Sequence, residues 1–246
     1  MSIERGVRPQ VTTLLLAAAV SIVIWFVPFA EFLDYPFRLF VTFIHEGGHA
    51  VAALVTGNSV RSLSVAMDGS GDTYTTQGGM LSQMLIASAG YLGSMAFGAL
   101  LLVLIREAVA ARVVLAGSAV LVFGLALVFG LIEPVVTGGA LAGIPFTLAA
   151  GIVLSAGLLA LARFASPRVA AFFVSLLAVQ CVLNAVLDLK TLFMLSSPLS
   201  ASAQTDAQNM ADATHVPAIV WTVLWIAIAG GILWFAMRLY VVKRHP

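Results

Sequence analysis

The feature that most constrains this chain is a series of long runs with almost no charged residue. A helix of about 20 apolar residues is long enough to cross the hydrocarbon core of a bilayer. Seven runs of about this size lie between charges and turn residues, at 11–30, 39–57, 81–105, 113–132, 140–162, 169–194 and 216–237. They predict an all-α membrane protein, a polytopic bundle of about seven transmembrane helices.

Composition supports this prediction and limits the partners of the chain. Hydrophobic residues make up 61% of the sequence and charged residues only 9%, whereas soluble domains carry roughly 25% charged residues on average. Most of the outer surface is therefore expected to face lipid, in a multi-pass protein of a cell membrane. The basic residues are scattered and form no block, which gives no reason to expect a nucleic acid partner. Residues 1–246 are expected to form a single membrane-embedded domain.

Residues 60–76 interrupt the apolar runs with a different period. Leu63, Val65 and Met67 alternate with smaller residues, as expected of a strand. The stretch DGSGD at 68–72 then supplies glycines for a tight turn. These features predict a small β-hairpin inserted after the second helix. Its two aspartates do not predict a calcium site, because the loop lacks the other oxygen ligands at the required spacing.

Two shorter patterns predict helix ends and helix contacts. Thr205 and Gln208 have the spacing of a capping box, which predicts a short interfacial helix at about 206–214. Gly90, Ser94 and Gly98 recur at every fourth position of the third run. Small residues at this spacing favour close helix packing in lipid.

The strongest chemical signal is the stretch HEGGH, which lies inside the second apolar run. His45 and His49 are four residues apart and project from one helical face, so both imidazoles can reach one zinc ion. Glu46 between them can act on the water that such an ion activates. Ionisable residues inside a membrane are costly and are functional candidates by default. The pattern therefore predicts a metal site with Glu46 as its general base.

A catalytic zinc usually has three protein ligands, so a third ligand is required. Asp188 is the favoured candidate, because it is the acidic residue well inside another apolar run. It lies on a polar stripe of the sixth predicted helix, formed with Gln180, Asn184 and Thr191. The alternative is that this stripe only makes hydrogen bonds between helices. Glu133, at a probable span end, and His215, in a polar connection, are less favoured. The single cysteine, Cys181, lies too far along the helix from Asp188 to share a metal with it.

The sequence resembles the M50 family of metallopeptidases, the site-2 protease group, and is most similar to its small M50B-like members. The motifs that carry the resemblance are FIHEGGHAVAALVTG, DGSGDTYT followed by IASAGYLGS, LNAVLDLKTLF, and TDAQNMADATHVPAIVW. In this family the second motif commonly ends in Leu-Asp-Gly, and its aspartate binds zinc. Here Leu189 stands in place of the glycine.

The resemblance implies a zinc-dependent intramembrane endopeptidase of a bacterial plasma membrane, with a transmembrane protein as its substrate. It assigns zinc to His45, His49 and Asp188, the general base to Glu46, and substrate or oxyanion binding to Asn184. The free edge of the hairpin, near Val65, is expected to pair with an extended substrate segment by strand addition. Two other readings remain open at this point. One is a membrane protein that keeps the metal without proteolysis, and the other is an ion-coupled transporter that uses these side chains as a relay.

Overall fold

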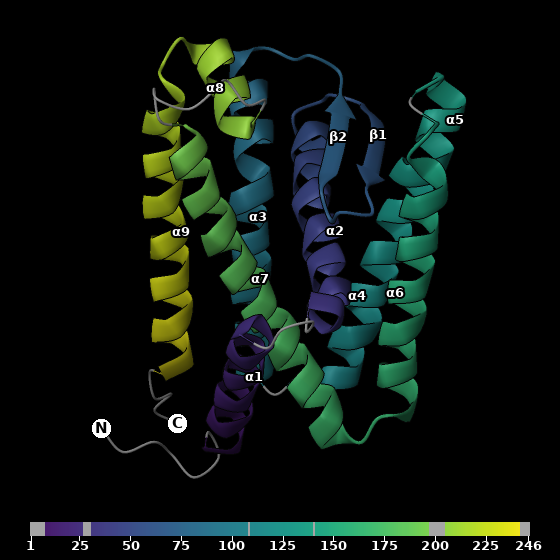
Figure 1. Ribbon diagram of the computed structural model, residues 1–246, viewed down its shortest axis with the longest axis vertical. Coiled ribbons are helices and arrows are strands. Elements are labelled where there is room, and N and C mark those ends of the chain that lie inside the picture. The colour runs from purple at the N-terminus through teal and green to yellow at the C-terminus, as the bar shows by residue number, and fades with distance from the viewer. Residues whose placement is uncertain (1–7, 27–30, 108, 140, 197–204, 242–246) are drawn as a thin grey trace.

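The computed structural model describes residues 8–26, 31–107, 109–139, 141–196 and 205–241 (Figure 1). It is a bundle of long helices that run roughly along one axis, and the hairpin, α5 and α8 lie toward the same end of it. In chain order the elements are α1 (Arg8–Phe26), α2 (Glu31–Val55), β1 (Val60–Val65), β2 (Gly71–Thr75), α3 (Met80–Arg106), α4 (Ala111–Leu127), the π-helix η1 (Val128–Ile132), α5 (Glu133–Thr137), α6 (Ile144–Phe164), α7 (Pro167–Leu195), α8 (Asp206–Thr214) and α9 (Ala218–Val241).

Five of the described helices are long and apolar enough to cross a membrane: Met80–Arg106, Ala111–Thr137, Ile144–Phe164, Pro167–Leu195 and Ala218–Leu239. The first predicted run corresponds to α1, whose apolar stretch is shorter, and the second corresponds to α2. Imidazole and carboxylate side chains lower the hydropathy of α2, and it falls outside this set of five. The predicted all-α membrane bundle with a hairpin after the second helix is confirmed.

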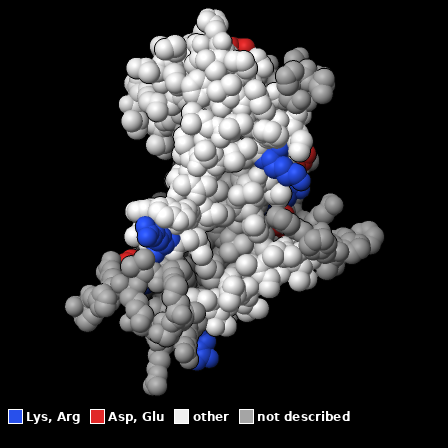
Figure 2. All heavy atoms as spheres, turned by 90° about the vertical axis from the view of Figure 1, so that its left-hand side faces the viewer, with Lys and Arg blue, Asp and Glu red and all other residues white. Residues whose placement is uncertain are grey.

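The surface of the bundle agrees with a lipid environment. Figure 2 shows a lateral face on which acidic and basic side chains are few and widely separated. Large apolar side chains are exposed along the outer helices, among them Val153 and Phe164 on α6 and Trp234 on α9. Exposed apolar area on this scale is unusual for a soluble monomer and indicates an interaction surface, here a membrane. The chain is a multi-pass membrane protein.

The hairpin forms as the sequence predicts. β1 and β2 pair antiparallel, with Leu63 opposite Thr73. The turn is closed by the Asp68 carboxylate, which accepts hydrogen bonds from the backbone N–H of Ser70 at 2.9 Å and from its hydroxyl at 2.7 Å. Gly69 has a φ of +85°, a conformation that a residue with a Cβ rarely adopts. These two hydrogen bonds also hold the pKa of the Asp68 carboxyl below its usual range.

Side chains of α2 fix this turn against the helix. Three of them, spaced on one helical face, donate to three successive backbone carbonyls. The bonds are Tyr35 to Met67 at 2.7 Å, Arg38 to Asp68 at 2.9 Å and Thr42 to Gly69 at 2.7 Å. We refer to Tyr35, Arg38 and Thr42 as the turn clamp. It ties the hairpin to the helix that carries the HEGGH motif.

The two edges of the hairpin have different surroundings. At the β1 edge, the backbone N–H of Val65 donates to the hydroxyl of Thr147 on α6 at 2.9 Å, and the Val65 side chain is only 1% exposed. Farther along β1, the hydroxyl of Thr137 lies 3.4 Å from the carbonyl of Arg61. β2 instead lines an open cavity. The edge that can accept another strand is therefore that of β2.

Candidate metal centre

His45, Glu46 and His49 occupy the middle of α2, where the i, i+4 spacing turns both imidazoles toward α3 and α8. Glu46 is 5% exposed and His49 6%. Polar groups this deeply buried need partners, because an unpaired buried charge costs several kcal/mol or changes its ionisation. The partners come from three other elements: α8, α3 and β2.

Asp206 reaches the histidines from α8. Thr205 caps this helix, since its hydroxyl accepts a hydrogen bond from the backbone N–H of Gln208 at 3.2 Å. The Gln208 side-chain amide donates a hydrogen bond to the Asp212 carboxylate at 2.8 Å, one turn farther along α8. Asp206 is the first residue of α8, where the helix dipole favours a negative charge. α8 packs across α3 and α9 at one end of the bundle, which brings this carboxylate above α2.

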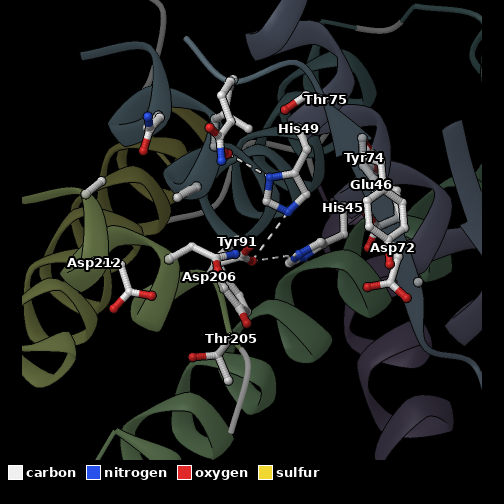
Figure 3. A pocket seen from close by; sticks show the side chains of 18 of the residues that line it. His45, Glu46, His49, Asp72, Tyr74, Thr75, Tyr91, Thr205, Asp206 and Asp212 are labelled. Carbon is white, nitrogen blue, oxygen red and sulfur yellow. Dashed lines mark hydrogen bonds and ion pairs between the residues drawn. The ribbon is translucent and has the colours of Figure 1, made fainter. Parts of the chain in front are cut away.

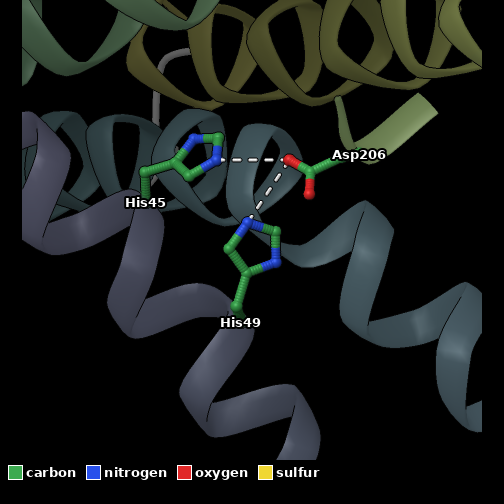
Figure 4. Close-up of side chains that lie close together, drawn as sticks. All are labelled: His45, His49 and Asp206. Carbon is green, nitrogen blue, oxygen red and sulfur yellow. Dashed lines mark ion pairs between the residues drawn. The ribbon is translucent and has the colours of Figure 1, made fainter. Parts of the chain in front are cut away.

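The three side chains form a compact group of potential metal ligands (Figure 4). One carboxylate oxygen of Asp206, Oδ2, lies 3.5 Å from Nε2 of His45 and 3.4 Å from Nε2 of His49. All three ligand atoms lie within 4.8 Å of one another. We call these residues the His-His-Asp group. Ligands about 2.0–2.1 Å from a tetrahedral zinc lie roughly 3.3–3.4 Å apart, so the two distances from Asp206 to the imidazoles, and the nitrogen and oxygen donors, fit zinc.

The second nitrogen of His49 is also engaged. Its Nδ1 lies 2.7 Å from the backbone carbonyl of Ile86 on α3, a geometry in which the ring N–H donates to that oxygen. A hydrogen bond of this kind fixes the ring orientation, and in the neutral ring it leaves the lone pair on Nε2, where a metal ligand requires it. The arrangement thus prepares His49 to bind a cation.

Two glycines allow α2 and α3 to approach closely at the group. A Cβ on Gly90 would meet Nε2 of both His45 and His49, and a Cβ on Gly48 would meet the backbone carbonyl of Ala89. Farther along α3, a Cβ on Gly98 would lie 2.9 Å from the Val182 side chain on α7. The close packing predicted from the small-residue pattern is therefore present, and at Gly90 it also makes room for the imidazoles.

β2 holds the side chain of Glu46. The Thr73 hydroxyl lies 2.7 Å from Oε2 of Glu46 and 3.2 Å from its backbone carbonyl. A Cβ on Gly71 would lie 2.7 Å from Oε1 of Glu46, so glycine leaves space for the carboxylate. Strand and helix therefore fix the position of this carboxylate together.

Two cavities meet at the group (Figure 3). The larger, of about 960 Å³, lies between β2 and α8, and the smaller, of about 290 Å³, lies between α2, the hairpin turn and α7. Both are lined by His45, Glu46 and Tyr91. A substrate segment in either cavity would contact the candidate metal site directly.

Carboxylates dominate the electrostatics of the larger cavity. Burial disfavours the charged form of Asp206, but the charge of His49 and the hydrogen bonds from both histidines outweigh burial and hold the pKa of this carboxyl well below its usual range. Burial and, to a smaller extent, the charge of Asp206 raise the pKa of Asp72 on β2. Asp212 lies on the opposite wall. Among the described residues that line this cavity, none is Lys or Arg.

The structure brings together some of the predicted site residues and separates others. His45, Glu46 and His49 meet as expected. Asp188 lies on α7 and lines the smaller cavity, but it is not part of the His-His-Asp group. Among the described residues, Asp206 is the carboxylate whose ligand atom lies within 4.8 Å of both imidazoles. Asp188 approaches His45 and Glu46 from α7 across the smaller cavity, and its role as a ligand stays a prediction.

Two further predicted residues have different surroundings from those expected. Asn184 lines the smaller cavity, and its amide donates to the Gln180 carbonyl at 2.9 Å and to the Gln180 side chain at 3.2 Å. Gln180 in turn donates to Asp34 at 2.9 Å. This part of the polar stripe therefore joins α7 to α2, as the alternative reading held. Val65 is packed against α6 and does not line either cavity.

The less favoured ligands are also outside the group. Glu133 begins α5, and His215 ends α8 in a left-handed conformation with a φ of 60°. Cys181 is fully buried on α7.

Sequence reasoning missed Asp206 because it searched for an acid inside an apolar run. The signal that could have found it is its position as the first residue after a capping threonine, in a short polar helix that had no other assigned role. A carboxylate at a helix N-terminus is common, and only the packing of α8 across α3 gives this one a ligand position.

Comparisons with known proteins agree with this site. No curated protein and no solved structure matches the chain. A protein-family profile described as Peptidase M50B-like matches residues 14–236, which include every helix that contributes to the His-His-Asp group. Because the match covers most of the sequence, the chain belongs to the Peptidase M50B-like family of membrane metallopeptidases.

Proposed function

We propose that this protein is a zinc-dependent intramembrane endopeptidase that cleaves membrane-spanning proteins in a bacterial plasma membrane. The observation that carries the proposal is the His-His-Asp group beside Glu46, on a buried helix and open to two cavities. Family membership supports peptidase chemistry at this place. Separations of 3.4 and 3.5 Å between the donors support zinc as the metal.

His45, His49 and Asp206 would hold the ion. Zinc bound there would lower the pKa of a water molecule towards about 7 and polarise the carbonyl of the scissile peptide. Glu46 takes the proton from the attacking water and later gives it to the leaving amine, as a general base and then a general acid. Thr73 orients the Glu46 carboxylate for both transfers.

A substrate helix must unwind before its peptide bond can reach Glu46, because a helical carbonyl is enclosed by its own hydrogen bond. We place the unwound segment along β2, whose outer edge faces the larger cavity. Backbone hydrogen bonds to an exposed strand edge hold a peptide extended, largely irrespective of its sequence. This replaces the expected contact at Val65, whose N–H is already bonded to Thr147. Asn184 and Asp188 line the smaller cavity and are proposed to contact the same substrate.

The test combines zinc content with cleavage of a transmembrane reporter by the purified, detergent-solubilised protein. Wild type should contain about one zinc per chain, as a single site of this type implies. Asp206→Ala should lose zinc. Removal of a residue that only supports a ligand lowers zinc affinity roughly 10–100-fold, and removal of a ligand itself should lower it more. Asp188→Ala is the matched control and should keep it.

Glu46→Gln separates peptidase chemistry from the alternatives. It should retain zinc and lose cleavage, because the amide cannot accept the proton of water. Zinc binding without any Glu46-dependent cleavage would instead favour a metal site with no proteolytic role. Zinc retained in Asp206→Ala but lost in Asp188→Ala would contradict the ligand set.

A further inference from the structure

Tyr91 is held rigidly beside the metal centre. It follows Gly90 on α3, and its ring packs edge-on against His45 with centroids 4.7 Å apart and an interplanar angle of 87°. The other side of the ring stacks on Trp225 of α9, with centroids 5.7 Å apart at 30°. The Trp225 indole is itself fixed, because its N–H donates to the Ser88 hydroxyl at 2.9 Å. The phenol is therefore oriented from two sides.

The hydroxyl of Tyr91 has no hydrogen-bond partner among the described residues. Tyr91 lines both cavities, and Figure 3 shows its ring beside Asp206 with the hydroxyl directed toward Thr205. Buried or partly buried hydroxyls usually have a partner. A free donor at this place points to a group that arrives with the substrate.

Three other side chains with donor groups near Glu46 already make hydrogen bonds within the protein. The Thr73 hydroxyl bonds to Glu46, and the Asn184 amide bonds to the carbonyl and side chain of Gln180. Arg38 donates to the carbonyl of Asp68 in the hairpin turn. Peptide hydrolysis places negative charge on the oxygen of the scissile carbonyl, and catalysis requires donors aimed at that oxygen. The Tyr91 hydroxyl is a donor without a described partner that lies beside His45 and lines both cavities.

We infer that the Tyr91 hydroxyl donates a hydrogen bond to the scissile carbonyl oxygen as charge develops on it, which makes Tyr91 a catalytic residue. The phenol keeps its proton throughout, and no bond to it forms or breaks. The inference rests on the proposed peptidase function. It differs from the expectation that Asn184 binds the oxyanion, because the described amide contacts of Asn184 lie within α7.

The first test is Tyr91→Phe, which keeps the ring stack and removes only the hydroxyl. We expect kcat for the transmembrane reporter to fall about 100-fold, as it does when one oxyanion donor is removed, with KM and zinc content unchanged. Ser175→Ala is the control, because it removes a buried hydroxyl on α7 that lines neither cavity and should keep full activity. The inference would be overturned if Tyr91→Phe kept the full kcat, or if its lower kcat were explained by lower zinc content. The proposed peptidase function would still stand in either case, as long as wild type cleaves the reporter and Glu46→Gln does not.

A second readout does not require turnover. Acetohydroxamate presents a carbonyl oxygen to a bound metal, so its affinity for the zinc-loaded protein reports on donors near that oxygen. Calorimetric titration should show about tenfold weaker binding to Tyr91→Phe than to wild type or Ser175→Ala, since a hydrogen bond to a charged group is lost. The two proposals can fail separately. The proposed function fails if wild type cleaves no reporter. The inference about Tyr91 fails if the hydroxamate binds all three proteins with equal affinity.

Discussion

At the scale of single residues, the metal centre depends as much on missing side chains as on ligands. Gly90 stands where any Cβ would meet both imidazole nitrogens, and Gly71 stands where a Cβ would meet the Glu46 carboxylate. His49 is oriented through its other nitrogen by the Ile86 carbonyl. The ligand geometry thus depends on residues that carry no chemistry of their own.

Gly90→Ala tests this dependence. The added methyl group must displace His45 and His49, so the variant should lose zinc while it keeps its helical content by circular dichroism. Gly93→Ala, three residues later on α3, is the matched control: its nearest contact would be the Gly48 Cα at 3.5 Å, an ordinary van der Waals distance. Zinc retained at the wild-type level in Gly90→Ala would show that the imidazoles are placed by other contacts.

The residue scale also shows what the sequence could and could not predict. His45, Glu46 and His49 follow from helical spacing alone, because residues four apart share a face whatever the tertiary structure. Asp206 does not, since its role depends on packing between α8 and α3, elements far apart in sequence. The sequence favoured Asp188 as the third ligand because burying an acidic side chain in an apolar run costs free energy and so suggests a function. Part of that polar stripe, Asn184 and Gln180, links α7 to Asp34 on α2.

At the scale of elements, the hairpin is positioned by α2 rather than by its own strand pairing. A two-stranded hairpin alone is at best marginally stable in water. The turn clamp connects this hairpin to α2 at its turn, and the bond from Thr73 to Glu46 connects it at the middle of β2. Local alternation predicted its strands and turn correctly. It could not predict which edge is covered, because that depends on Thr147 in α6.

The double variant Tyr35→Phe and Thr42→Val removes two hydroxyl donors of the turn clamp with little change in shape. Each lost hydrogen bond should cost about 1 kcal/mol of local stability. Amide hydrogen exchange in β2 should therefore become faster, and cleavage should fall because Thr73 holds Glu46 less firmly. Exchange in α4 and α6 serves as the internal reference and should not change. Unaltered exchange in β2 would mean that other contacts position the hairpin.

At the scale of the whole molecule, the site draws on elements from most of the chain. In the proposed site, α2 would supply two ligands and the base, and α8 would supply the third ligand. β2 holds Glu46, Tyr91 of α3 packs against His45, and Trp225 of α9 packs against Tyr91. Hydrophobic runs predicted the membrane bundle, because bilayer thickness sets helix length independently of packing. A ligand bound by helices from both halves of the chain should stabilise the whole fold.

Metal removal measures that stabilisation. Zinc that binds only the folded chain raises its stability by mass action, by about 2.7 kcal/mol at 100 times the Kd. A chelator should therefore lower the Tm of the detergent-solubilised wild type, and added zinc should restore it. Asp206→Ala should already have the lower Tm and should respond weakly to chelator. An equal chelator response in both proteins would place the stabilising metal at another site.

The position of Asp206 near the end of the sequence has a consequence for biosynthesis. The HEGGH helix is made early, but its carboxylate partner lies in α8 and the Trp225 that backs Tyr91 lies in α9. A nascent chain that has inserted only its first spans therefore has two histidines and a base without the third ligand. In the proposed peptidase, the site would therefore be complete only after α8 and α9 have been synthesised and have packed against α3.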